Sequence, residues 1–155
     1  MTVRQLVLAL SASEEAERLA AVANLVALGP AALPALMSEL RDDASPVTET
    51  ALLSALCSIG ASAFDPVLGV LQDAVPGSHW RALRVFTRLG TPALEGYLQA
   101  LAHDDPFVRR AAVMGVNGCG EDALRVANLL VPLLGDGDEG VRRVADAPSA
   151  RGEQL

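Results

Sequence analysis

The chain has 155 residues, a net charge of −7 and 51% hydrophobic residues, which predicts one folded domain with a sizeable core. It contains 27 Ala and 25 Leu but only one Ile and five aromatic residues, a composition that favours helices and nearly excludes a β-sandwich or β-barrel. All twelve basic residues are Arg, so lysine chemistry is excluded, and the acidic balance makes nucleic acid a poor partner.

The N-terminal residues carry no convincing export or membrane signal. The apolar run Leu6–Leu10 is shorter than the ~7–15 residues of a signal peptide. The stretch Leu19–Met37 has no charge over 19 residues, which is the length of a membrane span. It contains Gly29, Pro30 and Pro34, however, and the repeat described next explains it better as two soluble helices. We therefore expect a bacterial, cytoplasmic protein without a membrane partner.

A repeat of thirty residues organises the chain. Four twelve-residue segments end in an apolar residue or Cys followed by Gly, with spacings of 31, 30 and 30 residues between Gly29, Gly60, Gly90 and Gly120. Aligned without gaps, the segments carry apolar residues at their fourth, fifth and eighth positions, which lie on one side of a helix. Each segment predicts a helix, here called the first helix of a repeat, that ends at a Gly with positive φ.

A second helix is predicted after each glycine. The third residue after the Gly is always Ala, the fourth is Leu or Phe, and the eleventh is Leu or Val, which gives another apolar stripe. In the loops that follow, Ser45, Asp105 and Asp138 have the character of helix N-caps. Because one two-helix repeat cannot bury both of its apolar faces, the repeats must stack. The predicted fold is an all-α solenoid of about four helical hairpins plus partial caps.

In chain order, the predicted helices cover residues 3–10, 14–28, 31–41, 46–59, 62–72, 79–89, 92–102, 106–118 and 121–134. They form one domain, 1–147, with repeats at about 13–43, 44–74, 75–105 and 106–137. A degenerate repeat over 138–147 begins well, but Asp146 falls at an apolar position and Pro148 follows, so its helix should end there. We expect residues 148–155 to form a frayed tail.

The fourth repeat, DDPFVRRAAVMGVNGCG followed by Ala123 and Leu124, resembles the HEAT-like repeat first described in phycobilin lyase subunits. The resemblance covers residues 13–145; VRR recurs at 141–143, whereas the second and third repeats lose this motif. It implies a right-handed superhelix with second helices on the concave side and first helices on the convex side. Members of this family are mostly protein-binding scaffolds, and the pattern identifies fold better than function.

The resemblance also implies a role for the first position of each twelve-residue segment, which would point toward the seam between repeats. This position holds Arg18, Glu49, His79 and Arg109. We expect Arg109, and Arg142 in the degenerate repeat, to bridge to loop acids such as Asp73, Asp104 or Asp136. A structural ladder along the seam is a better interpretation than a ligand contact.

Catalytic and metal-binding motifs are missing from the sequence. Cys57 and Cys119 stand alone, and neither His79 nor His103 is followed by Glu, so we expect no metal, no cofactor and no catalytic residue.

Two alternatives from other proteins with HEAT-like repeats stay open: a bilin lyase-like subunit or chromophore-handling factor, and a DNA-binding protein. For DNA, Arg81, Arg84 and Arg88 lie in one sector of a first helix, although a solvated arginine face is the simpler interpretation.

We expect instead a non-enzymatic protein-interaction scaffold that uses the concave face. The fifth and ninth residues after each glycine point away from the predicted core. The groove residues expected to contact a partner are Ser38, Asp65, Glu95, Gln99, Arg125 and Leu129. Asp65 and Glu95 make the centre acidic, which fits a basic or extended peptide; ordinary solvated surface is an equally good interpretation.

Two departures from the repeat suggest further contacts. Trp80 stands where the other repeats have Leu, Thr or Arg, about 130° from the apolar centre of the helix, and is a candidate interface anchor. The predicted helix 121–134 is apolar nearly all round, which makes Leu130 a second candidate. We expect another copy of the chain, or sequence beyond this end, to cover that helix.

Overall fold

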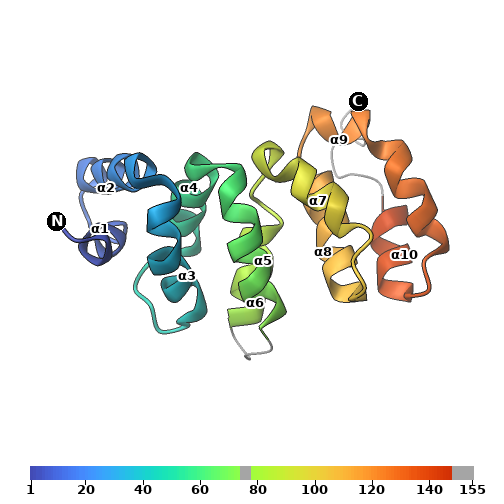
Figure 1. Ribbon diagram of the computed structural model, residues 1–155, viewed down its shortest axis with the longest axis horizontal. Coiled ribbons are helices and arrows are strands. Elements are labelled where there is room, and N and C mark those ends of the chain that lie inside the picture. Colours follow the sequence, from blue (N-terminus) through green and yellow to red (C-terminus); the bar gives the residue numbers. More distant parts are fainter. Residues whose placement is uncertain (74–77, 148–155) are drawn as a thin grey trace. The chain divides into compact units, whose positions relative to one another are not determined.

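The computed structural model describes residues 1–73 and 78–147, and over these residues it contains helices but no β-strand (Figure 1). The α-helices are α1 (Val3–Ala9), α2 (Glu15–Leu28), α3 (Leu33–Arg41), α4 (Glu49–Ile59), α5 (Phe64–Gln72), α6 (Ser78–Phe86), α7 (Leu94–Ala100), α8 (Pro106–Asn117), α9 (Glu121–Arg125) and α10 (Glu139–Asp146). The 3₁₀-helices are η1 (Gly29–Ala32), η2 (Ala61–Ala63), η3 (Thr91–Ala93) and η4 (Ala127–Gly135). The predicted alternation of first and second helices is confirmed, and α10 ends at Asp146 as predicted. Pro148 and the predicted tail lie outside the described residues.

The helices group into two compact units, an N-terminal unit (Met1–Leu89) and a C-terminal unit (Gly90–Leu155). In the N-terminal unit, α2 packs on α4 and α4 on α6, while α1 packs on α3 and α3 on α5. Each helix therefore contacts the helix of its own kind in the next repeat, which is the arrangement of an α-solenoid. The predicted fold class is confirmed, and the right-handed sense of the superhelix stays a prediction.

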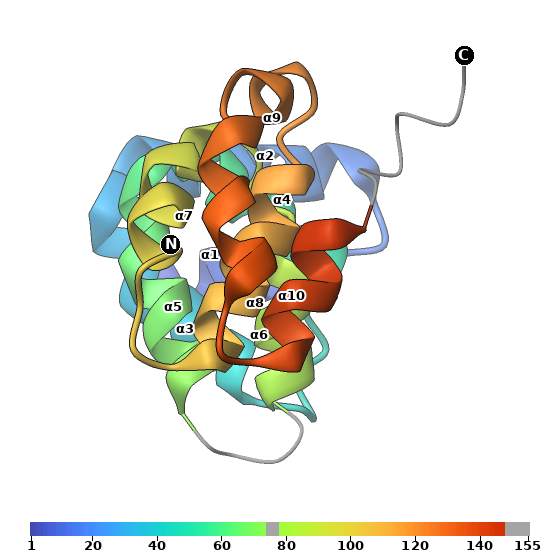
Figure 2. The ribbon, with the colours of Figure 1, turned by 90° about the vertical axis from the view of Figure 1, so that its right-hand side faces the viewer.

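In the C-terminal unit, α8 packs against both α7 and α10, and η4 packs against α10. Figure 2 shows α8 and α10 beside the orange η4 segment. A second helix also packs against the first helix that follows it, as for α7 with α8 here and α5 with α6 in the N-terminal unit.

The first helices bury the predicted stripe. Residues at the fourth and eighth positions of the repeat are at most 2% exposed: Ala21, Leu52, Ala82, Ala112, Leu25, Leu56, Phe86 and Val116. In the N-terminal unit the rings of Phe64 and Phe86 lie 5.2 Å apart between centroids. Each fully buried Leu or Phe side chain contributes ~1.5–3 kcal/mol of hydrophobic stabilisation, so these positions hold the helices together within each unit.

The four repeat glycines turn the chain out of each first helix. Among the described residues only they have positive φ, between 55° and 89°, and their ψ lies between −129° and −159°. This region is open essentially only to Gly, whereas the left-handed helical conformation typical of helix ends also admits Asn. The Ala three residues later closes a 3₁₀ turn: the amide of Ala63 donates to the carbonyl oxygen of Gly60 at 3.0 Å. Ala63 is fully buried, which explains the small residue.

The second helix of the fourth repeat is not the single α-helix that we predicted over 121–134. The α-helix ends at Arg125, and the chain continues as the 3₁₀-helix η4, which contains Pro132. A proline in the interior of an α-helix removes a backbone donor and clashes with the preceding turn. In α3, by contrast, Pro34 occupies the first turn, where proline is tolerated.

The apolar stripe is displaced in this repeat, in α9, which holds Leu124, and in η4, which holds Val131 and has three residues per turn. Leu124 and Val131 occupy repeat positions that are buried in the first two repeats, yet they are 72% and 58% exposed. Leu130 is buried instead. The C-terminal unit therefore presents apolar side chains that the repeat pattern would have covered.

The loop before α4 also differs from the prediction. Asp105 and Asp138 cap α8 and α10 as predicted, but the predicted cap at Ser45 is wrong, because α4 begins at Glu49 and Thr48 is its N-cap. Residues 42–48 therefore form a longer connection than expected, and this loop helps to shape the site described next.

Among the described residues, one stretch, Glu15–Arg41, is long and apolar enough to cross a membrane by length and composition alone. The chain turns at Gly29, so that α2 and α3 run in different directions (Figure 1). Of its most apolar window, 28% is buried. Core helices and signal sequences can share this composition, so it is weak evidence for a membrane span.

Candidate functional site

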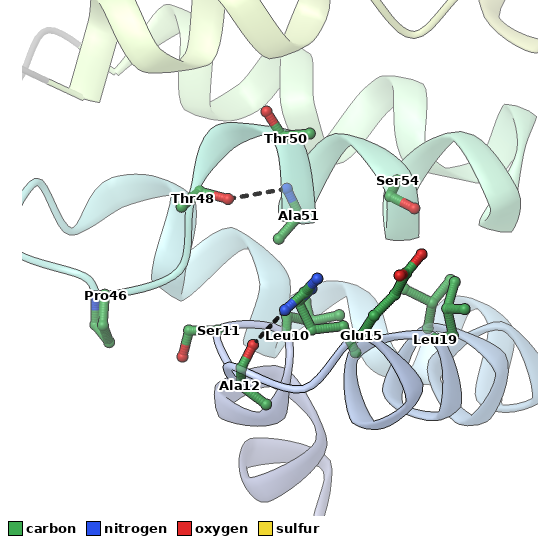
Figure 3. Close-up of a pocket in the computed structure, with 12 residues that line it drawn as sticks. Leu10, Ser11, Ala12, Glu15, Leu19, Pro46, Thr48, Thr50, Ala51 and Ser54 are labelled. Carbon is green, nitrogen blue, oxygen red and sulfur yellow. Dashed lines mark hydrogen bonds between the residues drawn. The ribbon is translucent and has the colours of Figure 1, made fainter.

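A pocket of about 430 Å³ lies between α2 and α4 of the N-terminal unit, closed at its ends by the residues after α1 and by the loop 42–48 (Figure 3). Its lining combines apolar side chains, four hydroxyl groups and one charge of each sign: Leu10, Ser11, Ala12, Glu15, Arg18, Leu19, Val22, Pro46, Thr48, Thr50, Ala51 and Ser54. We call it the α2–α4 pocket.

Helix packing explains why these side chains meet. Because α2 packs on both α1 and α4, Ala21 and Leu25 are buried, whereas Val22 and the neighbouring sector border the pocket. Glu15 and Leu19 project from α2 toward Ser54 of α4 in Figure 3. Leu19 is 61% exposed, so the pocket presents apolar surface that water still contacts.

Arg18 is held at the pocket by backbone carbonyl groups. Its Nη1 donates to the carbonyl oxygens of Ala12 at 2.7 Å and Ser13 at 2.8 Å. Its other edge, the Nε and Nη2 atoms that we call the fork, makes no ion pair with any described residue. These atoms are not among the buried unsatisfied atoms, so they reach solvent. Arg18 is therefore a cation whose position is fixed and whose fork is accessible.

Arg109 in the C-terminal unit is anchored in the same way. Its Nη1 donates to the carbonyl oxygens of His103 and Asp104, both at 2.9 Å, and these residues precede it by the same intervals as in the case of Arg18. Its fork donates to both carboxylate oxygens of Asp136, at 2.9 and 2.8 Å. The predicted bridge from Arg109 to a loop acid is confirmed. The hydrogen bond from Arg109 holds the pKa of Asp136 below its ordinary value.

The residues at the first position of the other repeats form different contacts. Arg142 donates from Nη1 to the backbone carbonyl of Asp136 at 2.6 Å. It makes no ion pair with a described residue, so its predicted bridge to a carboxylate is not formed. Glu49 reverses the charges: Nε of Arg84 donates to its Oε2 at 2.7 Å, and Nη2 to its Oε1. The hydrogen bond from Arg84 lowers the pKa of Glu49.

Arg81 binds the backbone of the loop 42–48. Its guanidinium donates to the carbonyl oxygen of Asp42 at 2.8 Å and to that of Val47, and Val47 is 1% exposed. The loop 42–48 is thereby tied to α6. Asp136 lies 27 residues after Arg109, whereas the residue 27 positions after Arg18 is Ser45. Ser45 has no carboxylate, and its hydroxyl donates to Oε2 of Glu39 at 2.5 Å. The fork of Arg18 therefore meets no acid at the equivalent position.

Arg81 is also a correction to the expected solvated arginine face. It is 7% exposed and is the only buried charged side chain among the described residues, and its Nε has no hydrogen-bond partner there. Of the three arginines that raised the DNA alternative, Arg81 is thus part of the core and Arg84 is paired with Glu49. Arg88 is exposed.

The six predicted groove residues are all exposed, but none of them lines the α2–α4 pocket. In the N-terminal unit, Ser38 lies on α3 and Asp65 on the neighbouring α5. In the C-terminal unit, Glu95 accepts a hydrogen bond from Gln99 on α7 at 3.3 Å. The remaining two are Arg125, paired with Asp122 at 3.3 Å, and Leu129 in η4, 47% exposed.

The two predicted anchors differ. Trp80 on α6 is 59% exposed, with its ring edge-to-face against His79 at 5.9 Å, so it is accessible to a partner. Leu130 is only 9% exposed and belongs to the core of the C-terminal unit, because η4 turns it inward. Leu124 and Val131 are exposed in its place and border a cavity of about 170 Å³.

The cysteines fit a packing role. Burial raises the pKa of the Cys119 thiol to about 11, and burial also raises the pKa of Cys57. Both are free thiols. Within residues 1–73 and 78–147, no group of three or more His, Cys, Asp or Glu side chains is placed to hold a metal ion.

Sequence reasoning placed Arg18 in the seam ladder but did not find the α2–α4 pocket. The pocket depends on where the loop 42–48 runs, and that path is set by Arg81 on a helix two repeats further along the chain. One local signal was present: Thr48 is also a favoured N-cap residue, although Ser ranks above Thr, and helix initiation at Glu49 lengthens the loop.

No family model matches the chain, and no curated protein matches it. Among solved structures, it is similar to a designed armadillo repeat protein in complex with the peptide (KR)4, with 18% sequence identity over 94% of this chain and 79% of that chain and a TM-score of 0.37. Likeness at this level does not define a fold, so the solenoid assignment rests on the helix packing within the units, and the HEAT-like assignment stays a prediction.

Proposed function

We propose that this chain is a non-enzymatic scaffold that binds another protein, and that the α2–α4 pocket is its principal contact. The observation that carries the proposal is the pairing of a positionally fixed cation, Arg18, with the exposed apolar side chain of Leu19 in one pocket. A fixed guanidinium beside apolar surface is the chemistry of an interface hot spot, where binding energy is concentrated in a few residues.

A protein suits this surface better than a small molecule because the exposed side chains continue beyond the pocket. Leu19, Thr50 and Trp80 share the second position of the repeat on α2, α4 and α6, which pack in that order, and all three are exposed. A row of this kind can contribute to the ~800 Å² that each partner buries in a typical interface. Protein binding would place the partner across the first helices of the N-terminal unit.

The groove on the second helices is a further proposed contact. Ser38 and Asp65 offer it in the N-terminal unit, and Glu95, Gln99, Arg125 and Leu129 offer it in the C-terminal unit. The carboxylates of Asp65 and Glu95 would favour a basic segment. We keep the cytoplasmic location as part of this proposal.

Self-association of the C-terminal unit is a second candidate function, favoured by the exposure of Leu124 and Val131. Light scattering across a concentration series tests it: a dimer that becomes monomeric in Leu124→Glu/Val131→Glu supports it, and a monomer at high concentration contradicts it. The bilin and DNA alternatives gain no comparable support from any contact described above.

Site-specific photo-cross-linking in the source cell tests the principal proposal. A benzophenone amino acid at Leu19 should give a discrete cross-linked protein that then binds the purified chain. The matched control is the same group at Asn24, which is exposed on α2 but does not line the pocket. Absence of any specific product at Leu19, Trp80, Asp65 and Glu95 would exclude a protein-binding surface at these places.

A further inference from the structure

We infer that the partner segment bound in the α2–α4 pocket carries an aspartate or glutamate side chain whose carboxylate pairs with the fork of Arg18. The inference rests on the proposed function and specifies its chemistry. It is drawn from a comparison inside the chain, because the C-terminal unit contains the same anchored arginine with its fork already paired.

The anchoring of the two arginines is equivalent in each contact that can be compared. In both, Nη1 donates to two successive carbonyl oxygens, and the donor–acceptor distances lie between 2.7 and 2.9 Å. This fixes the plane and the direction of the guanidinium before any carboxylate arrives. In Arg109, the edge left over binds Asp136 with two parallel hydrogen bonds, the geometry that makes arginine–carboxylate pairs strong and directional.

The pocket then selects for a carboxylate on a larger molecule. The apolar side chains of Leu19, Val22 and Pro46 line the same pocket, so a segment that places a carboxylate at Arg18 can bury apolar atoms beside it. Burial of apolar surface contributes ~25 cal/mol per Å², and this contribution would add to that of the ion pair. A free carboxylate ion could not gain it. The occupant is therefore an acidic residue within a polypeptide with an apolar neighbour.

Glu15 opposes this preference. Its carboxylate lines the same pocket, it makes no ion pair with a described residue, and it would repel an incoming acid. Removal of its charge should therefore strengthen binding, which gives the proposal a variant with the opposite sign to the loss of Arg18.

The test uses a phage-displayed library of random twelve-residue peptides, selected in parallel on the full chain and on Arg18→Gln. We expect selected peptides to be enriched in Asp or Glu next to an apolar residue on the full chain, and this enrichment to disappear with Arg18→Gln. Peptides selected without an acidic preference would overturn the inference but leave the proposed function standing. A full chain that enriches no peptide would count against both.

Affinities of one selected peptide, measured by fluorescence anisotropy, complete the test. Arg18→Gln and an Asp→Asn change in the peptide should each weaken binding about tenfold or more, and the two changes together should weaken it little further. Arg18→Lys should recover only part of the loss, because it keeps the charge without the fork. Glu15→Gln should tighten binding a few-fold, since it removes a like charge.

Two controls keep the result clear. Arg4→Gln makes the same charge change at an exposed arginine of α1 that does not line the pocket, and it should leave the affinity unchanged. Acetate at millimolar concentration should not displace the peptide; complete displacement would show a site for small carboxylates and would overturn the inference. If Arg18→Gln fails to fold by circular dichroism, the Asp→Asn peptide decides the question alone.

Discussion

Arg18 and Arg109 occupy the same position of two repeats and are anchored by the same pair of backbone contacts, yet they end in different roles. Arg109 forms an ion pair with Asp136, so its fork is occupied within the C-terminal unit. Arg18 has no such acid in the N-terminal unit, because Ser45 stands at the interval from Arg18 that Asp136 has from Arg109. A repeat position can therefore prepare a side chain, while the following loop decides whether that side chain serves the structure or remains accessible.

The two units also differ in how tightly their helices approach. In the C-terminal unit the ring of Tyr97, which is fully buried, lies against the backbone of Gly115 in α8. In the N-terminal unit Gly69 of α5 has no atom within 4 Å of the place that a Cβ would occupy. Packing therefore requires a glycine at Gly115, whereas at Gly69 there is space for a larger residue.

The largest expected effect comes from breaking this contrast with alanine. In Gly115→Ala the new Cβ would lie 2.3 Å from Cε1 of Tyr97, and overpacking of this kind costs ~1–3 kcal/mol of unfolding free energy. Gly69→Ala should instead stabilise by about 0.5–1 kcal/mol, because Ala is the better helix former. Thermal and urea unfolding of both variants measures the difference. Equal stability of the two variants would contradict the packing of the Tyr97 ring against Gly115 of α8.

The next effect separates the two arginines. Both Arg18→Gln and Arg109→Gln lose the bonds to carbonyl oxygens, but only Arg109→Gln also leaves a carboxylate without its partner. We expect Arg109→Gln to lower Tm by roughly 5 °C or more and Arg18→Gln to lower it by no more than about 2 °C. Calorimetry measures both. A larger loss for Arg18→Gln would mean that Arg18 is mainly structural.

Acid should weaken the paired seams. The folded-state pKa values of Asp136 and Glu49 lie below their ordinary values of 3.8 and 4.5. Their stabilisation is therefore complete above those ordinary values and is lost as the pH falls through the lowered folded-state values. Tm measured from pH 6 to pH 2 should fall in this range, and Asp136→Asn should flatten part of the fall. An unchanged pH profile in that variant would exclude Asp136 as a contributor.

The smallest effect concerns the two thiols, one in each unit. Cys119 is 6% exposed and its pKa is raised to about 11, whereas Cys57 is half-buried. Because the thiolate is the reactive form, iodoacetamide at pH 8 should modify Cys57 before Cys119. Mass spectrometry over time measures the two modification rates. Gly115→Ala should accelerate the modification of Cys119 and leave that of Cys57 unchanged, since it loosens only the C-terminal unit. Faster modification of Cys119 in the native protein would contradict its burial.

Much of the fold could be predicted from the sequence, because the patterns that indicate helices and turns are local. The repeat glycines predicted the turns, and the apolar positions of the first helices predicted the buried face, since both depend on contacts within a few residues. The second helix of the fourth repeat shows where this reasoning fails. Its composition predicts an α-helix, but residues 127–135 form the 3₁₀-helix η4, which contains Pro132. Within η4, Val131 is exposed and Leu130 is buried.

The candidate site could be predicted only in part from the sequence. The repeat marked Arg18 and Arg109 as equivalent, and the family resemblance suggested Asp136 among the acids that Arg109 could reach. It could not show that Arg81, in a sector that seemed solvated, is buried and holds the loop 42–48.

The amino-acid order by itself determined which residues form helices, where the chain turns and which faces are apolar, because those properties follow from neighbours one or two helical turns away. Only the tertiary structure decided which arginine meets a carboxylate and which one lines a pocket. The pair Arg109–Asp136 spans 27 residues and the contact of Arg81 with the loop 42–48 spans 39, so neither contact follows from neighbours one or two helical turns away.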